Sequence, residues 1–319
     1  MIEPKEVFQT LIKFAKYTGI WQMPQTSWIY RLNGPDIKTE RKHIKRFTKE
    51  VRLLHGILLV CAICSAISVS LIPFFNISKH ELSVRMHFPM LDYKNNDTIF
   101  ITIAVLQLTI VLGAIANITL DVFPIYFMCY AIGLIEELGD RLENIGSNHA
   151  VIGHQEENDG NDLNELLKCV EVHRKIKRLV SEIEEHFSFV IMLQGLMSSL
   201  IFCATAFMLS LLSPVKDFPL FIRFGTYAIT MVIQIFLPCY YGNEIATSSM
   251  KLSTRFFHCK WKKRDKKFNQ AMIFFMENTK RTINIRAFEL VDLNIETFNG
   301  ISKFAYSLFA LVSRVNNRE

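Results

Sequence analysis

The side chains that could perform acid–base or nucleophilic chemistry do not gather into a catalytic set. The sequence contains no GxSxG, HExxH, P-loop or GxGxxG motif, so no nucleophile elbow, zinc-protease site or nucleotide-binding loop is indicated. His173 and His258 stand near charged neighbours, and we expect surface or capping positions for both rather than catalytic bases. Cys61 and Cys64 form a CxxC pair without a second pair at zinc spacing. The sequence therefore argues against an enzyme and predicts neither a cofactor nor a metal site.

One carboxylate stands inside apolar sequence. Asp121 follows Leu120 deep within a long apolar stretch, where a carboxylate is costly and is a candidate for a functional role. The alternative is a structural hydrogen bond to a neighbouring helix, for example to Tyr126 or to a serine of the next apolar stretch. We favour this structural interpretation.

Hydroxyl groups and small residues collect on two other apolar stretches. The first stretch carries Ser65, Ser68 and Ser70, and a later one carries Gly225, Thr226, Tyr227 and Thr230. Together with Leu106, Leu108 and Ile110 they could line an apolar cleft with a few hydroxyls, which suits a small uncharged ligand. Small residues also serve helix–helix packing in membranes. Composition alone favours packing.

The end of the chain carries a regular apolar stripe. Its residues recur at three- and four-residue spacing, with serines 302, 307 and 313 on the other faces; the stripe is Phe304, Leu308, Leu311 and Val315. If several copies met at an axis, these apolar rings would form a constriction that closes by dewetting. Alternatively, the stripe packs on its own subunit. The sequence does not separate these readings.

Five long apolar stretches must position these residues. They cover approximately residues 53–75, 99–130, 187–213, 218–241 and 283–312. The first alone would be a helix of about 35 Å, which exceeds the hydrocarbon core of roughly 30 Å. Only helices and closed barrels satisfy their backbone in lipid. We predict an all-α membrane protein, a bundle of about five transmembrane helices. The net charge of +6 lies in short segments, so nucleic acid is not an expected partner.

Basic segments set the orientation. KTERKHIKRFTKEVR precedes the first apolar stretch and KWKKRDKK follows the fourth, which predicts that both are cytosolic. The N-terminus is then inside and the C-terminus outside. Two glycosylation sequons, at Asn76 and Asn96, fall in the loop that this scheme places outside. The predicted segments are 1–52 (cytosolic N-terminal segment and basic linker), 53–135 (two spans with an extracellular loop), 136–186 (cytosolic loop), 187–245 (two spans) and 246–319 (cytosolic anchor and C-terminal helix).

Two segments depart from the simple pattern. In the loop 136–186 we expect helical flanks that extend the neighbouring spans into the cytosol, around a disordered acidic middle, GHQEENDGND. The first half of the fifth stretch is charged, so we expect it to pack among cytosolic helix ends, with Glu289 and Asp292 meeting Lys262 or Arg264. A break at Asn299–Gly300 would leave a short terminal helix over 301–312.

The order of several motifs resembles the insect odorant receptor family. The N-terminal YTGIWQMP resembles the family's cytosolic start, and HFPMLDYKNND before NITLDVF is similar to its second extracellular loop and fourth span. LLKCVEVHRKIKRLVSEIEEHFSFVIMLQ resembles the approach to the fifth span. IQIFLPCYYGNEIATSS and FFHCKW resemble the sixth, and ETFNGISKFAYSLFALV resembles the pore helix.

This resemblance implies an odorant-gated, non-selective cation channel in the plasma membrane of olfactory neurons. The subunit would work beside a shared co-receptor in a tetramer, with a small volatile odorant and membrane lipid as the other partners. The odorant-pocket reading becomes favoured, with Ser65, Ser68, Ile72, Leu106, Ile110, Tyr227 and Met231 as candidates. The gate candidates are Ser307, Leu308, Leu311, Val312 and Val315. The anchor candidates are Trp261, Glu289, Asp292 and Glu296.

One departure from the family changes the expectation. The family has seven spans, and after QTSWIYRL this sequence continues with NGPDIKTERKHIKRF, which resembles the loop before the third span. The first two spans are therefore expected to be missing. Alternatives are a truncated, non-conducting or modulatory member and a gustatory-type channel. A G-protein-coupled receptor is not favoured, because that class has its N-terminus outside the cell, whereas the basic segments here place the N-terminus in the cytosol.

Overall fold

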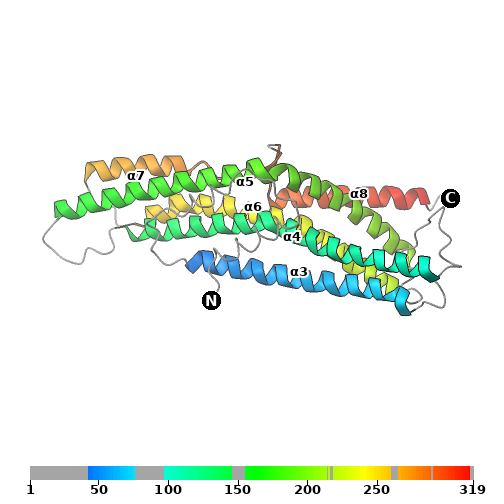
Figure 1. Cartoon of the computed structure of the whole chain (residues 1–319). Helices are drawn as coiled ribbons and strands as arrows, with labels where there is room; N and C mark the ends of the chain where they lie inside the picture. Colours follow the sequence, from blue (N-terminus) through cyan, green and yellow to red (C-terminus); the bar gives the residue numbers. More distant parts are fainter. Residues whose placement is uncertain are drawn as a thin grey trace. The chain divides into compact units, whose positions relative to one another are not determined.

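The computed structural model describes residues 42–75, 97–145, 155–213, 215, 218–259, 265–288 and 290–316. This part of the chain is almost entirely helical, which confirms the predicted all-α membrane fold (Figure 1). Its elements are α3 (Lys42–Phe75), α4 (Asp97–Asn144), α5 (Gln155–Leu211), α6 (Phe218–Phe257), α7 (Lys266–Thr279), β1 (Arg286–Ala287), β2 (Val291–Asp292) and α8 (Ile295–Asn316).

The chain divides into two compact units. One comprises Met1–Lys49 with Pro124–Glu319, and the other comprises Glu50–Phe123. The boundary within α4 falls at Pro124, whose ring removes one backbone hydrogen bond from the helix. The larger unit holds the first turns of α3, the second part of α4 and all later elements. The smaller one holds the rest of α3 and the first part of α4.

Three of the described helical stretches are long and apolar enough to cross a membrane. They are Ala116–Asn144, Gly160–Leu211 and Leu220–Phe257. The apolar part of the first is mostly buried inside the protein, whereas those of the other two are mostly exposed. Exposed large apolar side chains on a membrane helix are suited to lipid. The outward faces of α5 and α6 therefore suit a bilayer, and α4 is an inner helix.

The second part of α4 is the core of the larger unit. Its side chains are buried on every side of the helix, including Ile125, Met128, Ile132, Ile135, Leu138 and Leu142. A helix that is apolar all round has to be covered by its neighbours. Phe127 stacks on Phe187 of α5 at 5.7 Å between ring centroids, and polar contacts described below reach α6 and the start of α3.

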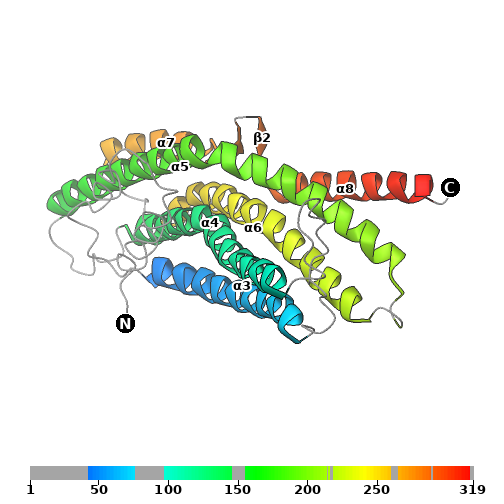
Figure 2. The same ribbon diagram turned by 45° about the vertical axis from the view of Figure 1, so that its right-hand side comes forward.

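α5 joins the other elements of this unit. In Figures 1 and 2, α7 lies along its first half and α8 along its second half. Between Asp162 and Phe187, one row of buried residues alternates at spacings of four and three, as in a coiled-coil seam: Asp162, Leu166, Cys169, His173, Ile176, Val180, Ile183 and Phe187. α5 packs on α6, α7, β1 and α8 through this and adjoining faces.

Two expectations for this helix were wrong. His173 is not a surface residue: it is buried, with its ring edge-on to Phe275 of α7 at 5.4 Å. The acidic sequence from Gln155 to Asp162 is not disordered but forms the first turns of α5. Negative charge is favourable near a helix N-terminus, which accounts for the acidic composition there. His258, as expected, caps a helix end, since its Nδ1 contacts the carbonyl of Thr254 at 2.7 Å.

The last apolar stretch also differs from expectation. Its first half forms a β-hairpin, not a helix end, with Arg286 opposite Asp292 and Ala287 opposite Val291. α8 then runs through Asn299 and Gly300 without a break over 22 residues, about 33 Å. The predicted break and the short terminal helix are therefore wrong. Exposed glycine lowers helix stability by only about 1 kcal/mol, which a long helix tolerates.

We expect Leu138→Ala to destabilise the larger unit strongly, because it opens a cavity in the enclosed part of α4. Leu138 is 1% exposed, and such truncations cost about 2–5 kcal/mol. The matched control is Leu167→Ala, at 54% exposure on α5, for which we expect little change. Thermal unfolding in detergent measures both. Equal melting temperatures would show that α4 is not enclosed.

Candidate functional site

α8 packs on α5 and α6 by one narrow face. Ala305 is buried, and Ile301 and Phe298 are half-buried on the same side. The other faces are exposed, with Phe304, Tyr306 and Leu311 each more than half exposed. A membrane helix with this much uncovered side chain needs lipid, water or other protein around it. The exposed faces of α8 are therefore available for contacts beyond α5 and α6.

Side-chain and backbone contacts fix where α8 begins. Asn294 is its N-cap, since its Oδ1 accepts a hydrogen bond from the amide of Thr297 at 2.8 Å. The Thr297 hydroxyl donates to the carbonyl of Asp292 at 2.6 Å, which ties the first turn to strand β2. Phe298 lies edge-on to Phe236 of α6 at 5.3 Å. The first turn of α8 is thus tied to the hairpin and to α6.

A close backbone approach holds the residue before this cap. A Cβ placed on Gly242 of α6 would lie 2.4 Å from the carbonyl oxygen of Leu293. No side chain fits in that space, so glycine allows α6 and the entrance to α8 to touch backbone to backbone. Ser249, two turns further along α6, accepts a buried hydrogen bond from the amide of Ile283 at 3.0 Å. These two contacts seat the segment before α8 on α6.

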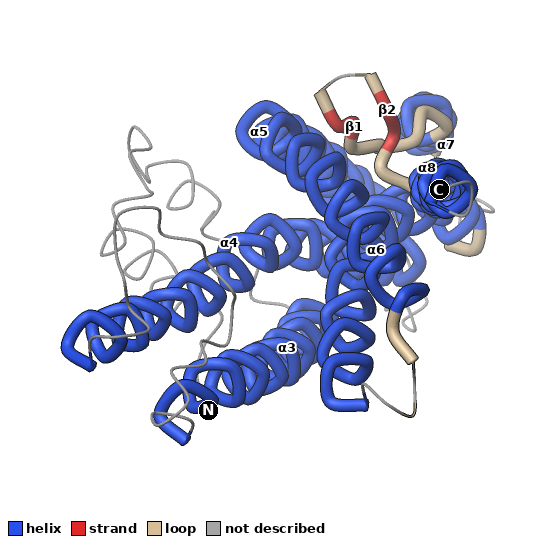
Figure 3. The backbone as a smooth tube through the Cα atoms, turned by 90° about the vertical axis from the view of Figure 1, so that its right-hand side faces the viewer, coloured by secondary structure: helices blue, strands red, loops and turns tan. Residues whose placement is uncertain are grey.

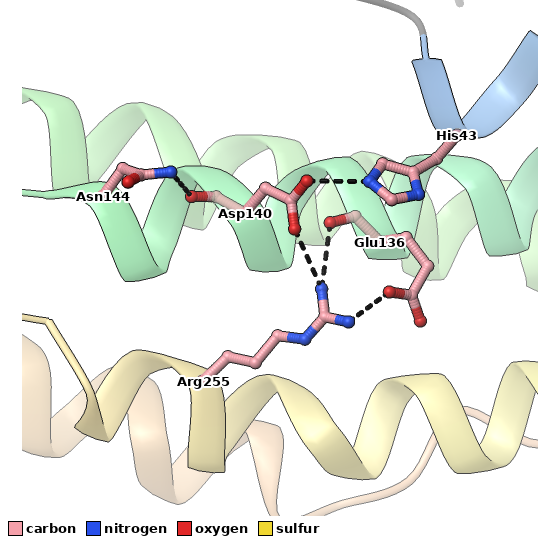
Figure 4. A network of polar contacts seen from close by, with 5 residues as sticks. All are labelled: His43, Glu136, Asp140, Asn144 and Arg255. Carbon is pink, nitrogen blue, oxygen red and sulfur yellow. Dashed lines mark hydrogen bonds and ion pairs between the residues drawn. The ribbon is translucent and has the colours of Figure 1, made fainter.

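A polar cluster braces the other end of the same bundle (Figure 4). Arg255 of α6 forms an ion pair with Glu136 and a second one, at 3.2 Å, with Asp140, and it also donates to the Glu136 carbonyl at 3.3 Å. His43 Nε2 lies 2.7 Å from the other oxygen of Asp140. Asn144 donates to the Asp140 carbonyl at 2.7 Å. Glu136 and Asp140, one turn apart, thereby link α4 to α6 and to the start of α3.

Glycine makes room for this arginine. A Cβ on Gly139 would lie 2.6 Å from Arg255 Nη1 and 2.8 Å from its Cδ, so the Arg255 side chain lies across α4 at that point. The cluster holds charges in fixed positions without a nucleophile, and so it suits bracing of helices rather than catalysis. In the described part of the chain, His, Cys, Asp and Glu residues nowhere form a group that could hold a metal ion.

Comparison with known proteins shows which family the chain belongs to. A family model described as 7tm odorant receptor matches residues 31–306. The chain belongs to the insect odorant receptor family. Odorant receptor 94a of Drosophila melanogaster is 30% identical over 209 residues, which are 65% of this chain and 51% of that receptor. Odorant receptor Or1 of Anopheles gambiae is 27% identical over 282 residues, which are 82% and 66% of the two chains.

A solved odorant receptor shares the fold. The structure of the insect olfactory receptor OR5 from Machilis hrabei in complex with eugenol matches with a TM-score of 0.69 at 17% identity, over 90% of this chain and 73% of that chain. Family and helix composition together identify a membrane protein. The chain spans between about half and two thirds of the length of the two insect relatives named above.

The structure places only part of the predicted odorant-pocket set. Ser65, Ser68 and Ile72 lie on α3, and Leu106 and Ile110 on α4, but their side chains are outside the described part. On α6, Tyr227 is 45% exposed and Met231 is buried. The pocket therefore stays a prediction. Asp121 accepts a hydrogen bond from Asn117 of its own helix at 3.2 Å, whereas the structural interpretation favoured above was a hydrogen bond to a neighbouring helix.

The gate and anchor predictions have a similar outcome. On α8, Ser307 and Leu311 are exposed and Leu308 is half-buried, while the side chains of Val312 and Val315 are outside the described part. Asp292 and Glu296 are exposed at the entrance to α8, and Asp292 acts there through its carbonyl. Trp261 and Glu289, the expected partners Lys262 and Arg264, and the sequons at Asn76 and Asn96 lie outside the described residues.

Sequence reasoning missed the residues that hold this framework. Gly242 stood in the motif IQIFLPCYYGNEIATSS without a stated role, and Ser249, Arg255 and His43 carried no signal of their own. Glu136 and Asp140 share one helix face at a four-residue spacing, which could have marked them as a paired acceptor for a base. Their partner comes from 115 residues away for Asp140, beyond the reach of local patterns.

We expect Gly242→Ala to disturb the seating of α8, because the added methyl group would meet the Leu293 carbonyl at 2.4 Å. The control is Gly225→Ala in the same helix, where nothing lies within 4 Å of the new Cβ. Alanine favours helix over glycine by about 1 kcal/mol, so the control should be neutral or stabilising. Melting temperature in detergent and protection of the Leu293 amide from hydrogen exchange measure the difference. Equal behaviour of the two variants would contradict the close approach.

We expect Arg255→Met to lower the free energy of unfolding by about 1–3 kcal/mol, since Glu136, with a side chain only 14% exposed, loses this charged partner. The control is Lys280→Met, which removes an exposed pair with Glu277 and should cost less than about 1 kcal/mol. Adding Glu136→Gln to Arg255→Met should restore part of the loss. A double-mutant cycle of Arg255 and Glu136 that shows no coupling energy would contradict a stabilising role for this ion pair.

Proposed function

We propose that this chain is an odorant receptor subunit of a heteromeric, ligand-gated, non-selective cation channel that detects small volatile molecules. The observation that carries the proposal is the family match over residues 31–306. The likeness of fold to a solved olfactory receptor supports the helical arrangement that such a subunit needs. The expected partners are a volatile odorant, a shared co-receptor and membrane lipid.

In this proposal α8 is the pore helix. One subunit covers only a narrow face of α8, and the exposed faces that include Phe304, Ser307 and Leu311 would meet the same helix of other subunits around an axis. Apolar side chains at such an axis close a pore by excluding water. The gate residues that we propose are Ser307, Leu308, Leu311, Val312 and Val315. Asp292 and Glu296, with Trp261 and Glu289, would belong to the anchor that assembles the subunits.

We place the subunit in the plasma membrane with its N-terminus in the cytosol and its C-terminus outside. The basic segments 38–52 and 260–267 support this orientation, because lysine and arginine favour the cytosolic side of spans. Asn76 and Asn96 would then be available for glycosylation on the outer side.

The ligand site that we propose is an apolar cleft with a few hydroxyl groups. The OR5 structure from Machilis hrabei holds eugenol, a small molecule with a phenolic hydroxyl, which supports this ligand class for the family fold. The cleft residues are Ser65, Ser68, Ile72, Leu106, Ile110, Tyr227 and Met231. The hydroxyls of Ser65, Ser68 and Tyr227 would orient the odorant, and the apolar residues would contribute most of the contact area.

A second candidate function has its own support. The chain covers 51% of odorant receptor 94a and 66% of Or1, which agrees with the expectation that two spans of the family pattern are missing at the junction of Leu32 and Asn33. An odorant cleft without one of its walls would bind poorly. The chain would then be a non-conducting or modulatory member that assembles with other subunits and changes their currents.

We expect co-expression of this chain with an olfactory co-receptor to give odorant-evoked cation currents that the co-receptor alone does not give. Whole-cell recording under a panel of volatiles that includes eugenol measures this, with surface biotinylation to confirm delivery. Leu311→Thr should change the currents by altering the apolar constriction, and Leu167→Thr on α5 is its control.

Two outcomes separate the candidates. Surface delivery with currents equal to those of the co-receptor alone, over the whole panel, would refute the ligand-gated subunit. If co-expression instead suppresses or alters the currents of the co-receptor, without any new odorant-evoked current, the chain has the modulatory role. A version with two spans inserted between Leu32 and Asn33 shows whether the missing segment accounts for any loss.

A further inference from the structure

The β-hairpin between α7 and α8 has a fixed base and an exposed tip. Its base residues Ile283, Ile285, Ala287 and Leu293 are all buried. The amide of Leu293 donates to the carbonyl of Ile285 at 2.9 Å and closes the base, while Ser249 and Gly242 of α6 hold its two arms. At the tip, Phe288, Leu290 and Val291 are largely exposed. The two arms of the base are therefore attached to α6, while β1 also packs on α5.

Two side chains of the hairpin, Arg286 and Phe288, contact a different helix, α5. Arg286 Nε lies 3.2 Å from Glu184 Oε1 of α5, and the ring of Phe288 lies 5.9 Å from that of Phe189. In Figure 3, β1 lies on the side of the hairpin nearer α5 and β2 on the far side. The hairpin thus spans from α6 to α5 directly before the first turn of α8.

The two attachments differ in strength. The attachment to α6 is buried and includes a backbone contact that leaves no space for a methyl group. On the α5 side, β1 packs on the helix, and the side-chain contacts at the tip are one ion pair, in which Arg286 is 51% and Glu184 16% exposed, and one contact between half-exposed rings. Ion pairs with an exposed partner contribute little, because water and salt screen them. The contact with α5 can therefore open while the base stays intact.

The backbone conformation at the tip also supports a contact with α5 that can open. Phe288 has φ of 52°, in the left-handed region that non-glycine residues rarely adopt. Strained residues persist where surrounding contacts hold them, and they occur at elements that switch. Here the turn from Ala287 to Leu290, closed by a 3.1 Å hydrogen bond, aims the strained phenylalanine at Phe189. The residue with the unfavourable backbone conformation, Phe288, therefore lies at the side-chain contact with α5.

We propose that Glu184 and Arg286, with Phe189 and Phe288, form a releasable latch that holds the entrance of α8 against α5, and that its release accompanies opening of the channel. This inference rests on the proposed channel function and adds positioning residues that act on α8 through the hairpin. They do not touch the odorant or the permeating ion. Release of the latch leaves the segment before α8 attached to α6 through Gly242 and Ser249, and leaves the packing of α8 on α5 and α6 in place.

The test is the odorant dose–response of Glu184→Gln, recorded with the co-receptor at matched surface density. Neutralising the carboxylate weakens the latch, so we expect the half-maximal concentration to fall about two- to five-fold and the ligand-free current to rise. Arg286→Gln should act in the same direction. The exchange Glu184→Arg with Arg286→Glu should return the concentration toward that of the wild type. A merely structural role would lower surface density without moving this concentration.

Controls and a second variant keep the test decisive. Glu171→Gln removes an exposed pair with Lys175 on the same helix and should leave the dose–response unchanged. Phe189→Ala breaks the ring contact without changing charge and should also lower the half-maximal concentration. An unchanged or raised concentration in the Glu184, Arg286 and Phe189 variants overturns the latch while the wild-type current upholds the channel. Absence of any wild-type odorant current overturns the channel, and the latch with it.

Discussion

The enclosure of α4 is the constraint from which the larger unit follows. From Pro124 to Ile135 this helix is apolar on every face, and nearly all of its side chains there are buried. Phe127 meets α5, while Glu136 and Asp140 meet Arg255 of α6 and His43 of α3. Polar contacts sit at the end of the enclosed stretch, where charges are still partly hydrated and cost less to fix. The core is therefore apolar inside and braced by charges at one end.

Because α4 occupies the inside, the other helices have apolar surface to spare. α5 and α6 expose much of their apolar spans, and α8 buries little more than one narrow face. Lipid satisfies the first two without further protein. α7 and α8 both pack on α5, and His173 of the buried row on α5 contacts Phe275 of α7. The last helix is thus held along one face on α5 and α6, and its other faces stay uncovered by the described part of the chain.

Sequence patterns anticipated the long helices but not the elements between them. The apolar runs, the helical repeat around Leu166 and the family motifs are continuous in sequence, so they could be read locally. The hairpin could not be predicted from sequence, because strands of two residues show no alternation. In addition, the positive-φ position of its turn is occupied by Phe288 and not by glycine or asparagine, the residues that usually mark such a turn. The start of α8 was readable: Asn294 is a preferred N-cap residue, and the acidic Glu296 follows in the first turn. Arg255 and Gly242 depend on partners far away in the chain.

The seating of α8 constrains how this helix can move. Between Gly242 and Leu293 the backbones touch, and a shift of α8 along α6 would force atoms into contact that have no room to yield. Buried packing resists such shifts more than exposed contacts do. α7 is held on α5 by Phe275, against His173, and by its other buried residues. The chain between α7 and α8 therefore joins two well-packed elements. α8 itself packs on both α5 and α6, so the half-exposed contacts of Arg286 and Phe288 with α5 are the part of this joint with least buried packing to resist a local shift.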